Sequence, residues 1–177
     1  MKDMNKEELY GKLRQVKMLV MDVDGTLTDA KVYYSRNGEE LKCFSIRDGM
    51  GIDLLRLNGI QPAIMTSENS PIVTARANKL KIEHVVLGAR QKAASMRDLS
   101  ASTGIPLENM AFLGDDINDI PAMEIAGLAV CPSNAHETVK SIVHYICSQA
   151  GGNGAARELA ELILTAQNKP LTIPSNW

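Results

Sequence analysis

The chain has 177 residues, of which 45% are hydrophobic and 23% are charged, and its formal net charge is -2. This length suits one domain with a real core, and the scattered lysines and arginines give no electrostatic case for binding nucleic acid. No apolar stretch approaches the roughly 20 residues that cross a bilayer, and the N-terminus lacks the apolar core of a secretion signal. We therefore expect a soluble, cytoplasmic protein that binds neither nucleic acid nor a membrane.

Strand and helix signals alternate along the chain from close to the N-terminus. Asn5, with a glutamate three residues later, can cap a short amphipathic helix. Met18–Met21 is an uninterrupted apolar run, which is typical of a strand buried on both faces of a parallel sheet. Residues 32–46 indicate a β-hairpin, because Asn37-Gly38 is a strong two-residue turn signal between arms that carry aromatic residues.

After the hairpin the same alternation continues toward the C-terminus. Further strands are predicted over 60–65, 84–87, 110–113 and 128–130, with a possible edge strand over 144–147. Helices are predicted over 52–57, 71–80, 92–102 and 155–167, with a short one around Pro121 and another capped by Asn134. Repeated β-α units with short links predict an α/β fold with a doubly wound parallel sheet. We expect one domain over 1–168, including the projecting hairpin, and a tail over 169–177.

Two clusters of acidic residues follow predicted strands. The first is Asp22-Val-Asp24-Gly25, directly after Met18–Met21. The second, after 110–113, comprises Asp115, Asp116, Asn118 and Asp119. The first cluster alone would be more typical of a solvated turn, and an EF-hand calcium loop is disfavoured by the early glycine and the missing closing glutamate. Because the carboxyl ends of parallel strands meet at one edge of a sheet, the two clusters together predict a metal site suited to phosphoryl transfer.

Residues in four places, taken in series, resemble the four motifs of the haloacid dehalogenase superfamily. They are Asp22-Val-Asp24-Gly25-Thr26, Thr66, Lys92, and Gly114-Asp115-Asp116 with Asn118-Asp119. More narrowly, residues 12–168 are similar to the small capless phosphatases of 3-deoxy-2-ulosonate phosphates. These are the 3-deoxy-D-manno-octulosonate 8-phosphate (KDO 8-phosphate) phosphatases and their nonulosonate 9-phosphate relatives. The hairpin, 44–52 and 151–158 carry this closer likeness.

The chain has no room for a cap domain over the predicted site. Between Asp24 and Thr66 the hairpin and one helix leave no room for the cap domain that encloses the site in many relatives. The site of one chain would therefore be open, and a neighbouring subunit could exclude water from it through the hairpin and the glycine-rich tail. We expect a homo-oligomer on these grounds, and the resemblance implies a homotetramer.

Phosphoester chemistry and the resemblance together assign roles to the motif residues. Magnesium suits an all-oxygen site, with Asp22 and Asp115 as side-chain ligands and the backbone carbonyl of Asp24 as a third. Asp22 is expected to attack phosphorus and form an aspartyl-phosphate, while Asp24 protonates the leaving alkoxide and then activates water. Thr66 would donate its hydroxyl to the phosphoryl oxygens, and Lys92 would neutralise their charge and orient Asp22.

Further residues are expected around this centre. Asp116, Asn118 and Asp119 are predicted to orient the residues that contact the metal rather than to bind it themselves. The backbone amide of Ser67 could help to bind the phosphoryl group. The carboxylate of a sugar acid needs a cation, for which Arg157 is the candidate. Arg47 and Arg76 are the alternatives.

The second motif reads Thr66-Ser67-Glu68, where the octulosonate branch usually has Thr-Gly-Arg. Glu68 in combination with Arg76 and Lys79 resembles the nonulosonate branch, where the glutamate is implied to contact the sugar near C5 and the lysine to pair with it. In contrast, Arg47-Asp48-Gly49 looks like the octulosonate branch. The sequence therefore predicts a sugar-acid phosphate substrate and leaves open whether it has eight or nine carbons.

Other functions are weighed against this one. A broad sugar-phosphate phosphatase stays open, whereas a phosphomutase would need a closed site to protect its intermediate from water. A non-catalytic assembly module beside a sugar-nucleotide enzyme is a third possibility, because Ser67 and Gln91 depart from the family pattern. The cysteines lack metal-ligand spacing and are expected to be buried free thiols. They are Cys43, Cys131 and Cys147.

Overall fold

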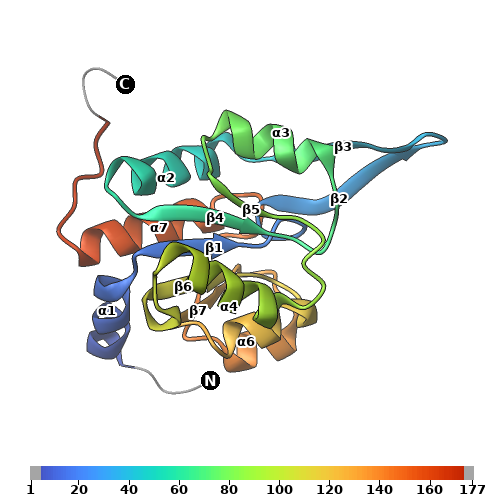
Figure 1. Ribbon diagram of the computed structural model, residues 1–177. Helices are drawn as coiled ribbons and strands as arrows, with labels where there is room; N and C mark the ends of the chain where they lie inside the picture. The colour runs from blue at the N-terminus through green and yellow to red at the C-terminus, as the bar shows by residue number, and fades with distance from the viewer. Residues whose placement is uncertain (1–4, 174–177) are drawn as a thin grey trace.

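The computed structural model describes residues 5–173, and a six-stranded parallel sheet lies at its centre (Figure 1). In chain order the strands are β1 (Met18–Met21), β2 (Thr28–Ser35), β3 (Gly38–Phe44), β4 (Gln61–Met65), β5 (His84–Val86), β6 (Met110–Leu113), β7 (Leu128–Cys131) and β8 (Tyr145–Ile146). The helices are α1 (Lys6–Gln15), α2 (Ile46–Leu57), α3 (Pro71–Lys79), α4 (Lys92–Thr103), α5 (Ile120–Met123), α6 (Glu137–Ile142) and α7 (Ala155–Ala166), with 3-10 turns η1 (Leu107–Asn109) and η2 (Ile117–Asp119).

The sheet has the strand order β5-β4-β1-β6-β7-β8, with every neighbouring pair parallel. The chain fills one side of β1 first and then crosses to the other, so the order reverses between β1 and β6. Ligands of doubly wound sheets bind at such a reversal, beyond the carboxyl ends of the strands. The predicted α/β architecture is confirmed, and the tyrosine-containing edge strand also forms as β8.

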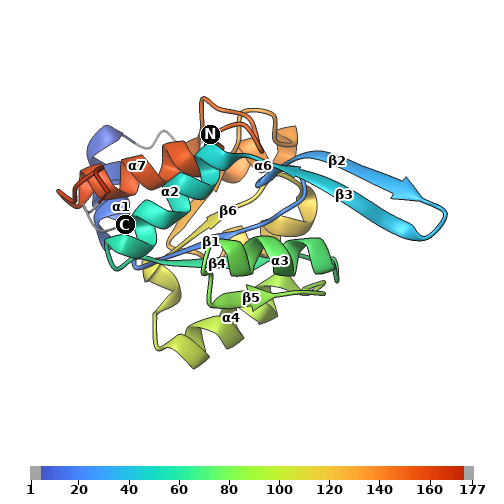
Figure 2. The ribbon, with the colours of Figure 1, turned by 90° about the horizontal axis from the view of Figure 1, so that it is seen from above.

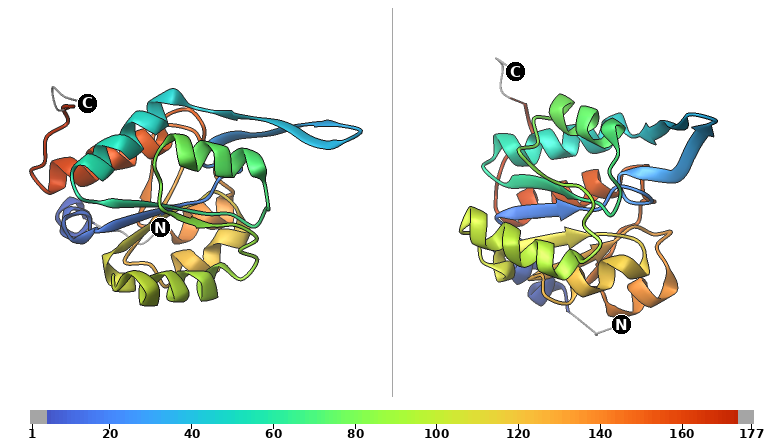
Figure 3. Two further views of the ribbon diagram at one scale, coloured as in Figure 1. Left: turned by 45° about the horizontal axis from the view of Figure 1, so that its top comes forward. Right: turned by 45° about the vertical axis from the view of Figure 1, so that its right-hand side comes forward.

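Helices cover both faces of the sheet, as Figure 3 shows. Alternate residues of β1 belong to opposite cores, because successive side chains of a strand point to opposite faces. Leu19 and Met21 pack in the core that includes residues of α1, α2, α3 and α7, while Met18 and Val20 pack in the core that includes residues of α4, α5 and α6. All four residues are fully buried, which explains the uninterrupted apolar run.

The hairpin of β2 and β3 forms a separate two-stranded sheet that projects from the body of the molecule (Figures 1 and 2). It starts at Thr28, earlier than the predicted 32, and its ladder is irregular between Thr28 and Val32. Large apolar side chains on it are exposed to solvent: Tyr33, Tyr34 and Leu41. An exposed hairpin with such side chains is suited to contact another subunit.

Several local predictions were wrong. Helix α2 begins at Ile46 rather than at 52. His136, not Asn134, accepts the capping hydrogen bond of α6, since the side chain of Asn134 instead accepts a hydrogen bond from the backbone of Gly151. Of the three free cysteines, Cys43 is exposed, because it lies on the projecting β3, while the other two are buried as expected.

The described residues include no helix that is long and apolar enough to cross a membrane. The end of the predicted tail, 174–177, and the first residues, 1–4, lie outside the part of the chain that the structure describes.

Candidate active site

The two acidic clusters meet at the edge of the sheet where the strand order reverses. Met21 pairs with Leu113 in the register of β1 and β6, so Asp22 and the second cluster leave the sheet side by side. The backbone amide of Asp22 donates to the carbonyl of Leu113 at 2.9 Å, which fixes the first residue beyond β1. Carboxylate oxygens of Asp22, Asp115 and Asp119 all lie within 4.8 Å of one another. The structure thus brings together acids that lie far apart in the sequence.

Lys92, the first residue of α4, points its side chain into this acidic group. Its Nζ lies 2.6 Å from Oδ1 of Asp22 and 2.5 Å from Oδ1 of Asp119, and the side chain is fully buried. Burial alone would lower the pKa of Lys92, but the two carboxylates outweigh it and raise this pKa above its ordinary value. The lysine is therefore held as a cation that fixes one oxygen of Asp22.

The site carries more negative charge than this lysine can balance. Burial, followed by the charge of Asp119, raises the pKa of Asp22 to about 7, against the opposing effect of Lys92. Burial also raises the pKa of Asp115 to about 6. Three clustered carboxylates facing one ammonium group leave an excess of two negative charges, which a divalent cation would neutralise. The oxygen donors and their charge therefore fit a magnesium ion.

The two oxygens of Asp22 have different surroundings. Oδ1 accepts the hydrogen bond from Lys92, whereas no donor from the described residues reaches Oδ2. Asp22 as a whole is nevertheless buried, with 6% of its surface accessible. A carboxylate fixed at one oxygen and open at the other is suited to bind a cation or to attack an electrophile.

Asp119 supports the site rather than facing outward from it. Its Oδ1 accepts from Lys92, and its Oδ2 accepts from the backbone amides of Asp115 at 3.0 Å and Asp116 at 3.3 Å. One oxygen of Asp119 therefore holds Lys92, and the other holds the loop that presents Asp115. Asp116 caps η2 by accepting from the Ile117 amide. These contacts support an orienting role for both residues, which stays a prediction.

The turn after β1 depends on two small residues. Gly25 has a φ of +94°, and a Cβ on it would lie 2.0 Å from Oδ2 of Asp115, so only glycine fits there. The buried hydroxyl of Thr26 donates to Oδ1 of Asp115 at 2.8 Å. Thr26 is part of the first sequence motif, but the sequence predicted no role for it. The structure makes it the residue that orients Asp115.

Thr66 follows β4, the other neighbour of β1, and is buried at the same edge of the sheet. Its hydroxyl accepts from the backbone amide of Glu68 at 3.2 Å. The Ser67 hydroxyl donates to the carbonyl of Ala89 and accepts from the side chain of Asn118, both at 3.4 Å. The hydrogen bond between Ser67 and Asn118 therefore links the second motif to the second acidic cluster.

The structure also brings to the site residues of the hairpin that sequence reasoning missed. Lys42 of β3 forms ion pairs with Asp24 and with Glu39, and Glu39 accepts a hydrogen bond from the Ser70 hydroxyl. Ser70 is the residue before α3, but its side chain makes no capping bond, because its hydroxyl instead donates to Glu39. Burial opposes the charge of Lys42, yet its two carboxylate partners raise its pKa above the ordinary value.

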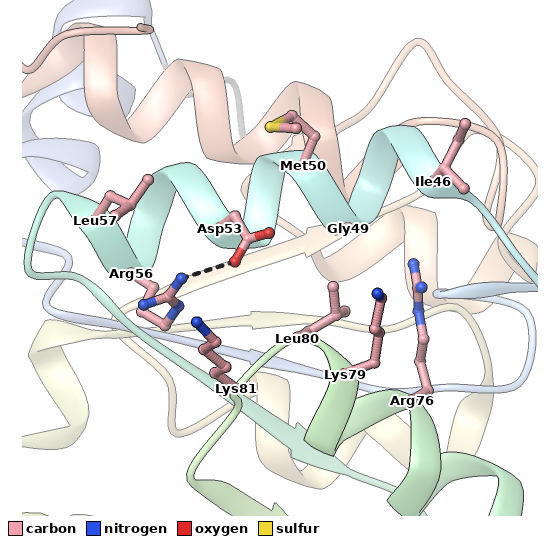
Figure 4. A pocket seen from close by; sticks show the side chains of 10 residues that line it. All are labelled: Ile46, Gly49, Met50, Asp53, Arg56, Leu57, Arg76, Lys79, Leu80 and Lys81. Atoms are coloured by element: carbon pink, nitrogen blue, oxygen red, sulfur yellow. Dashed lines mark hydrogen bonds and ion pairs between the residues drawn. The ribbon is translucent and has the colours of Figure 1, made fainter. Parts of the chain in front are cut away.

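The predicted substrate-binding residues are spread over separate surfaces. Glu68 is exposed before the start of α3, and Lys79 is the last residue of that helix, so the two lie at opposite ends and form no ion pair within this chain. Arg76 donates to the carbonyl of Ser45 at 2.9 Å and lies over the ring of Phe44. Figure 4 shows Arg76 and Lys79 extending from α3 toward α2.

Two cavities contain these cations. The first, of about 630 Å³, lies between α2 and α3 and is lined by Arg76 and Lys79 (Figure 4). The second, of about 390 Å³, is lined by Arg47 and Arg157. Arg47 and Arg157 thus line the same cavity, and Arg76 lines a different one.

Buried Asp48 connects the start of α2 to the glycine-rich segment before α7. Its carboxylate accepts from the backbone amides of Gly154 at 3.2 Å and Arg157 at 2.9 Å. Burial raises the pKa of Asp48 despite these bonds. This contact, which the sequence reading did not foresee, fixes the position of Arg157 relative to Arg47.

Comparisons with known proteins agree with this geometry. Residues 56–159 match the haloacid dehalogenase-like hydrolase family. The chain is 39% identical over 162 residues to the 3-deoxy-D-manno-octulosonate 8-phosphate phosphatase of Escherichia coli K12, which covers 92% of this chain and 86% of that protein.

Solved structures give the same result. The 3-deoxy-D-manno-octulosonate 8-phosphate phosphatase of Moraxella catarrhalis, in complex with magnesium, phosphate and KDO, has a TM-score of 0.90 at 39% identity and covers 93% of this chain and 94% of that chain. The cobalt-bound phosphatase of Haemophilus influenzae has a TM-score of 0.87 at 39% identity and covers 89% of this chain and 92% of that chain.

Proposed function

The chain belongs to the haloacid dehalogenase-like hydrolases and is a phosphatase, and from that premise we propose that it hydrolyses the phosphomonoester of a 3-deoxy-2-ulosonate, with KDO 8-phosphate as the leading substrate. The observation that carries the proposal is the buried carboxylate of Asp22, which is ion-paired at Oδ1 and open at Oδ2 beside Asp115. The likeness to KDO 8-phosphate phosphatases over most of the chain supports the substrate class.

Residues of this chain would perform the reaction in two steps. Oδ2 of Asp22 attacks phosphorus in line, while Lys92 holds Oδ1 and so aims the attacking oxygen. Asp24 gives a proton to the departing sugar alkoxide, and the enzyme is left as an aspartyl-phosphate. Asp24 then takes a proton from water as that water attacks phosphorus, which releases phosphate and restores Asp22.

Other groups would stabilise the charge that develops on the phosphoryl oxygens. The Thr66 hydroxyl and the Ser67 amide directly follow β4, the strand next to β1, and are suited to donate to these oxygens. Magnesium bound by Asp22, Asp115 and the carbonyl of Asp24 would screen the repulsion between the phosphate dianion and the Asp22 carboxylate. The orienting residues, Asp119 above all, keep Asp115 in place for that role.

Release of phosphate from KDO 8-phosphate by the purified protein, with and without magnesium or a chelator, tests this proposal. We expect turnover that the chelator abolishes, with inorganic phosphate and free sugar acid as products. Isomerisation without phosphate release would indicate a mutase instead. Equal turnover of unrelated sugar phosphates would favour a broad phosphatase. The alternative of a non-catalytic assembly module is set aside, because the chain belongs to a hydrolase family.

A nine-carbon substrate is the second candidate, and Glu68 favours it. Glu68 stands where the octulosonate branch usually has arginine, and its side chain is exposed and free of any ion pair with the described residues. A carboxylate can accept a hydrogen bond from a hydroxyl or amide of the sugar, whereas arginine can only donate. Comparison of kcat/KM on KDO 8-phosphate and on a nonulosonate 9-phosphate distinguishes the two candidates.

We also propose that the enzyme acts in the cytoplasm as a homotetramer in which neighbouring subunits cover the open sites. The exposed tyrosines of the hairpin and the wide separation of Glu68 from Lys79 support this, since residues of one substrate site can come from two chains. Sedimentation velocity on the wild type and on a Tyr33→Ser, Tyr34→Ser double variant tests it. We expect the wild type to sediment as a tetramer and the variant as smaller species, and a monomeric wild type would contradict the proposal.

A further inference from the structure

We propose that Lys42 of the hairpin is a positioning residue that holds the carboxylate of Asp24 in place for proton transfer. This inference rests on the proposed function, because it concerns the acid-base residue of that reaction. It assigns the hairpin a role within its own chain, in addition to any contact with a neighbouring subunit.

The burial of Lys42 is unusual for its location. Strand β3 is largely exposed, yet the side chain of Lys42 is only 1% accessible. Its Nζ forms ion pairs with Asp24 and, at 2.9 Å, with Glu39. Because a buried ammonium group is costly unless it is paired, both carboxylates are needed to keep it there.

The contacts continue beyond the ion pairs into the body of the protein. Glu39 also accepts from the hydroxyl of Ser70, the residue that precedes α3. Ser70, Glu39, Lys42 and Asp24 therefore form one connected network that joins α3, the hairpin and the turn after β1. Asp24, at its end, keeps 29% of its side chain accessible, so it is anchored on one side and can reach a ligand on the other.

A second lysine of the hairpin shows what an ordinary ion pair looks like here. Lys31 of β2 lies 3.6 Å from Asp29, and its side chain is 72% exposed. Such surface pairs contribute little to stability and fix little geometry. Lys42 differs in burial, in the number of partners and in the identity of one partner, which is the expected acid-base residue.

The chemistry explains why the anchor is a lysine. The ammonium group of Lys42 has only hydrogen-bond donors, and it donates to Oδ1 of Asp24. It therefore cannot take the proton that Asp24 has to transfer. The second oxygen, Oδ2, is left to carry the proton toward the alkoxide and later to receive one from water. Misplacement of a reacting group by about 1 Å can cost on the order of a hundredfold in rate, so loss of the anchor should be felt in the step that needs the proton.

Rates on two esters with different leaving groups distinguish a loss of Asp24 positioning from a general disturbance of the fold. KDO 8-phosphate has a poor alkoxide leaving group that needs a proton, whereas p-nitrophenyl phosphate releases a stable phenolate that needs little help. The parameter to measure is kcat/KM, because it reports the first chemical step and not the breakdown of the aspartyl-phosphate. Variants are Lys42→Met, Lys42→Arg and, as the matched control on the same hairpin, Lys31→Met.

We expect Lys42→Met to lower kcat/KM on KDO 8-phosphate by about ten- to a hundredfold and on the aryl ester by less than about threefold. Lys42→Arg should restore much of the loss, and Lys31→Met should match the wild type on both esters. A crystal structure of Lys42→Met should show the Asp24 carboxylate in a changed rotamer. Melting temperatures close to that of the wild type would show that the variants fold.

Three results would overturn the inference. Equal losses on both esters would mean that Lys42 acts through the fold, and unchanged rates on both would mean that it has no role in the reaction. An Asp24 side chain in its wild-type position in the Lys42→Met crystal would also contradict it. Failure of the proposed function would be seen separately, since the wild type itself would then not release phosphate from KDO 8-phosphate, whatever its rate on the aryl ester.

Discussion

The carboxyl edge of β1 and β6 and the surface of α2 and α3 represent two different ways of building a site. At the sheet edge, buried Asp22, Lys92 and Asp119 contact one another within one chain. On the helical surface, Arg76 and Lys79 line an open cavity, and Glu68 lies at the far end of α3 from Lys79. Groups that handle a phosphoryl transition state must be preorganised, whereas groups that choose among sugars can be completed by substrate or by another subunit.

The largest effect should come from the sheet edge. Asp22→Asn keeps the shape of the side chain but removes the nucleophile, so turnover of any phosphomonoester should fall by more than about a thousandfold. The fold should be retained, because a neutral amide replaces a carboxylate whose pKa burial has raised. Steady-state phosphate release and melting temperature measure both effects. Retained turnover would rule out the covalent mechanism.

Lys92 should matter for stability as well as for rate. Lys92→Met leaves Asp22 and Asp119 buried without their shared cation, which typically costs about 3–5 kcal/mol of folding free energy. Turnover should fall by on the order of a hundredfold or more, because a charged donor is lost. Urea unfolding of the metal-free protein measures the first effect.

The surface pair of Lys140 with Glu137 provides the control for that experiment. Its partners are 2.8 Å apart, with Lys140 half-buried and Glu137 exposed, so Lys140→Met should leave both unfolding and turnover nearly unchanged. A Lys92→Met variant as stable as the wild type would show that Asp22 and Asp119 do not need the Lys92 cation to remain buried in the folded protein.

On the helical surface we expect a smaller and more selective effect. Glu68→Arg should change the ratio of kcat/KM between KDO 8-phosphate and a nonulosonate 9-phosphate by roughly ten- to a hundredfold, the range of a lost charge-assisted hydrogen bond. Turnover of p-nitrophenyl phosphate should change little, since it lacks the sugar. Lys79→Met is the companion variant, because it tests whether the two residues act together across subunits.

Equal losses on all three substrates would instead place Glu68 in support of the phosphate site, through its backbone contact with Thr66. In that case the surface of α2 and α3 would contribute to the phosphoryl chemistry as well as to the choice of sugar. The nine-carbon substrate would then lose its main support.

The sheet edge could be predicted from sequence more completely than the rest, for a physical reason. Strands buried on both faces give uninterrupted apolar runs, so Met18–Met21 and Met110–Leu113 were predicted to the residue, and the acids that follow them were found with them. Both runs end where the backbone leaves the sheet.

The start of α2 was hidden by its glycines, which disfavour a helix. Gly51 is needed because a Cβ there would lie 2.8 Å from Cα of Arg157 in α7. Close packing between helices overrides local preference at this point, and a single sequence does not display that packing.

Lys42 was missed for a related reason. On a projecting hairpin a lysine is typical of a solvated strand face, and its burial follows only from the position of the end of β3 beside Asp24. The identity of Asp24 as a motif residue could be read from the sequence, but the partner that holds it could not.

The smallest expected effect is on the pH dependence of stability, and it tests the charge excess at the sheet edge without any substrate. In the folded protein the pKa of Asp22 is raised from 3.8 to about 7 and that of Asp115 to about 6, chiefly by burial. Between about pH 4 and pH 7 the folded chain therefore holds protons that the unfolded chain releases, so their contribution to stability is complete below this window and is lost as pH rises through it. Melting temperatures measured in chelator should fall less between pH 5 and pH 7.5 for Asp22→Asn than for the wild type, by a few degrees, while Asp29→Asn, a half-buried carboxylate on the hairpin, should follow the wild type. Magnesium should restore the wild type at pH 7.5 because it binds the folded state in place of the lost protons. If Asp22→Asn and the wild type lose stability in parallel, or if magnesium leaves the wild type unchanged, the carboxylates at this edge do not carry the uncompensated charge that distinguishes it from the helical surface.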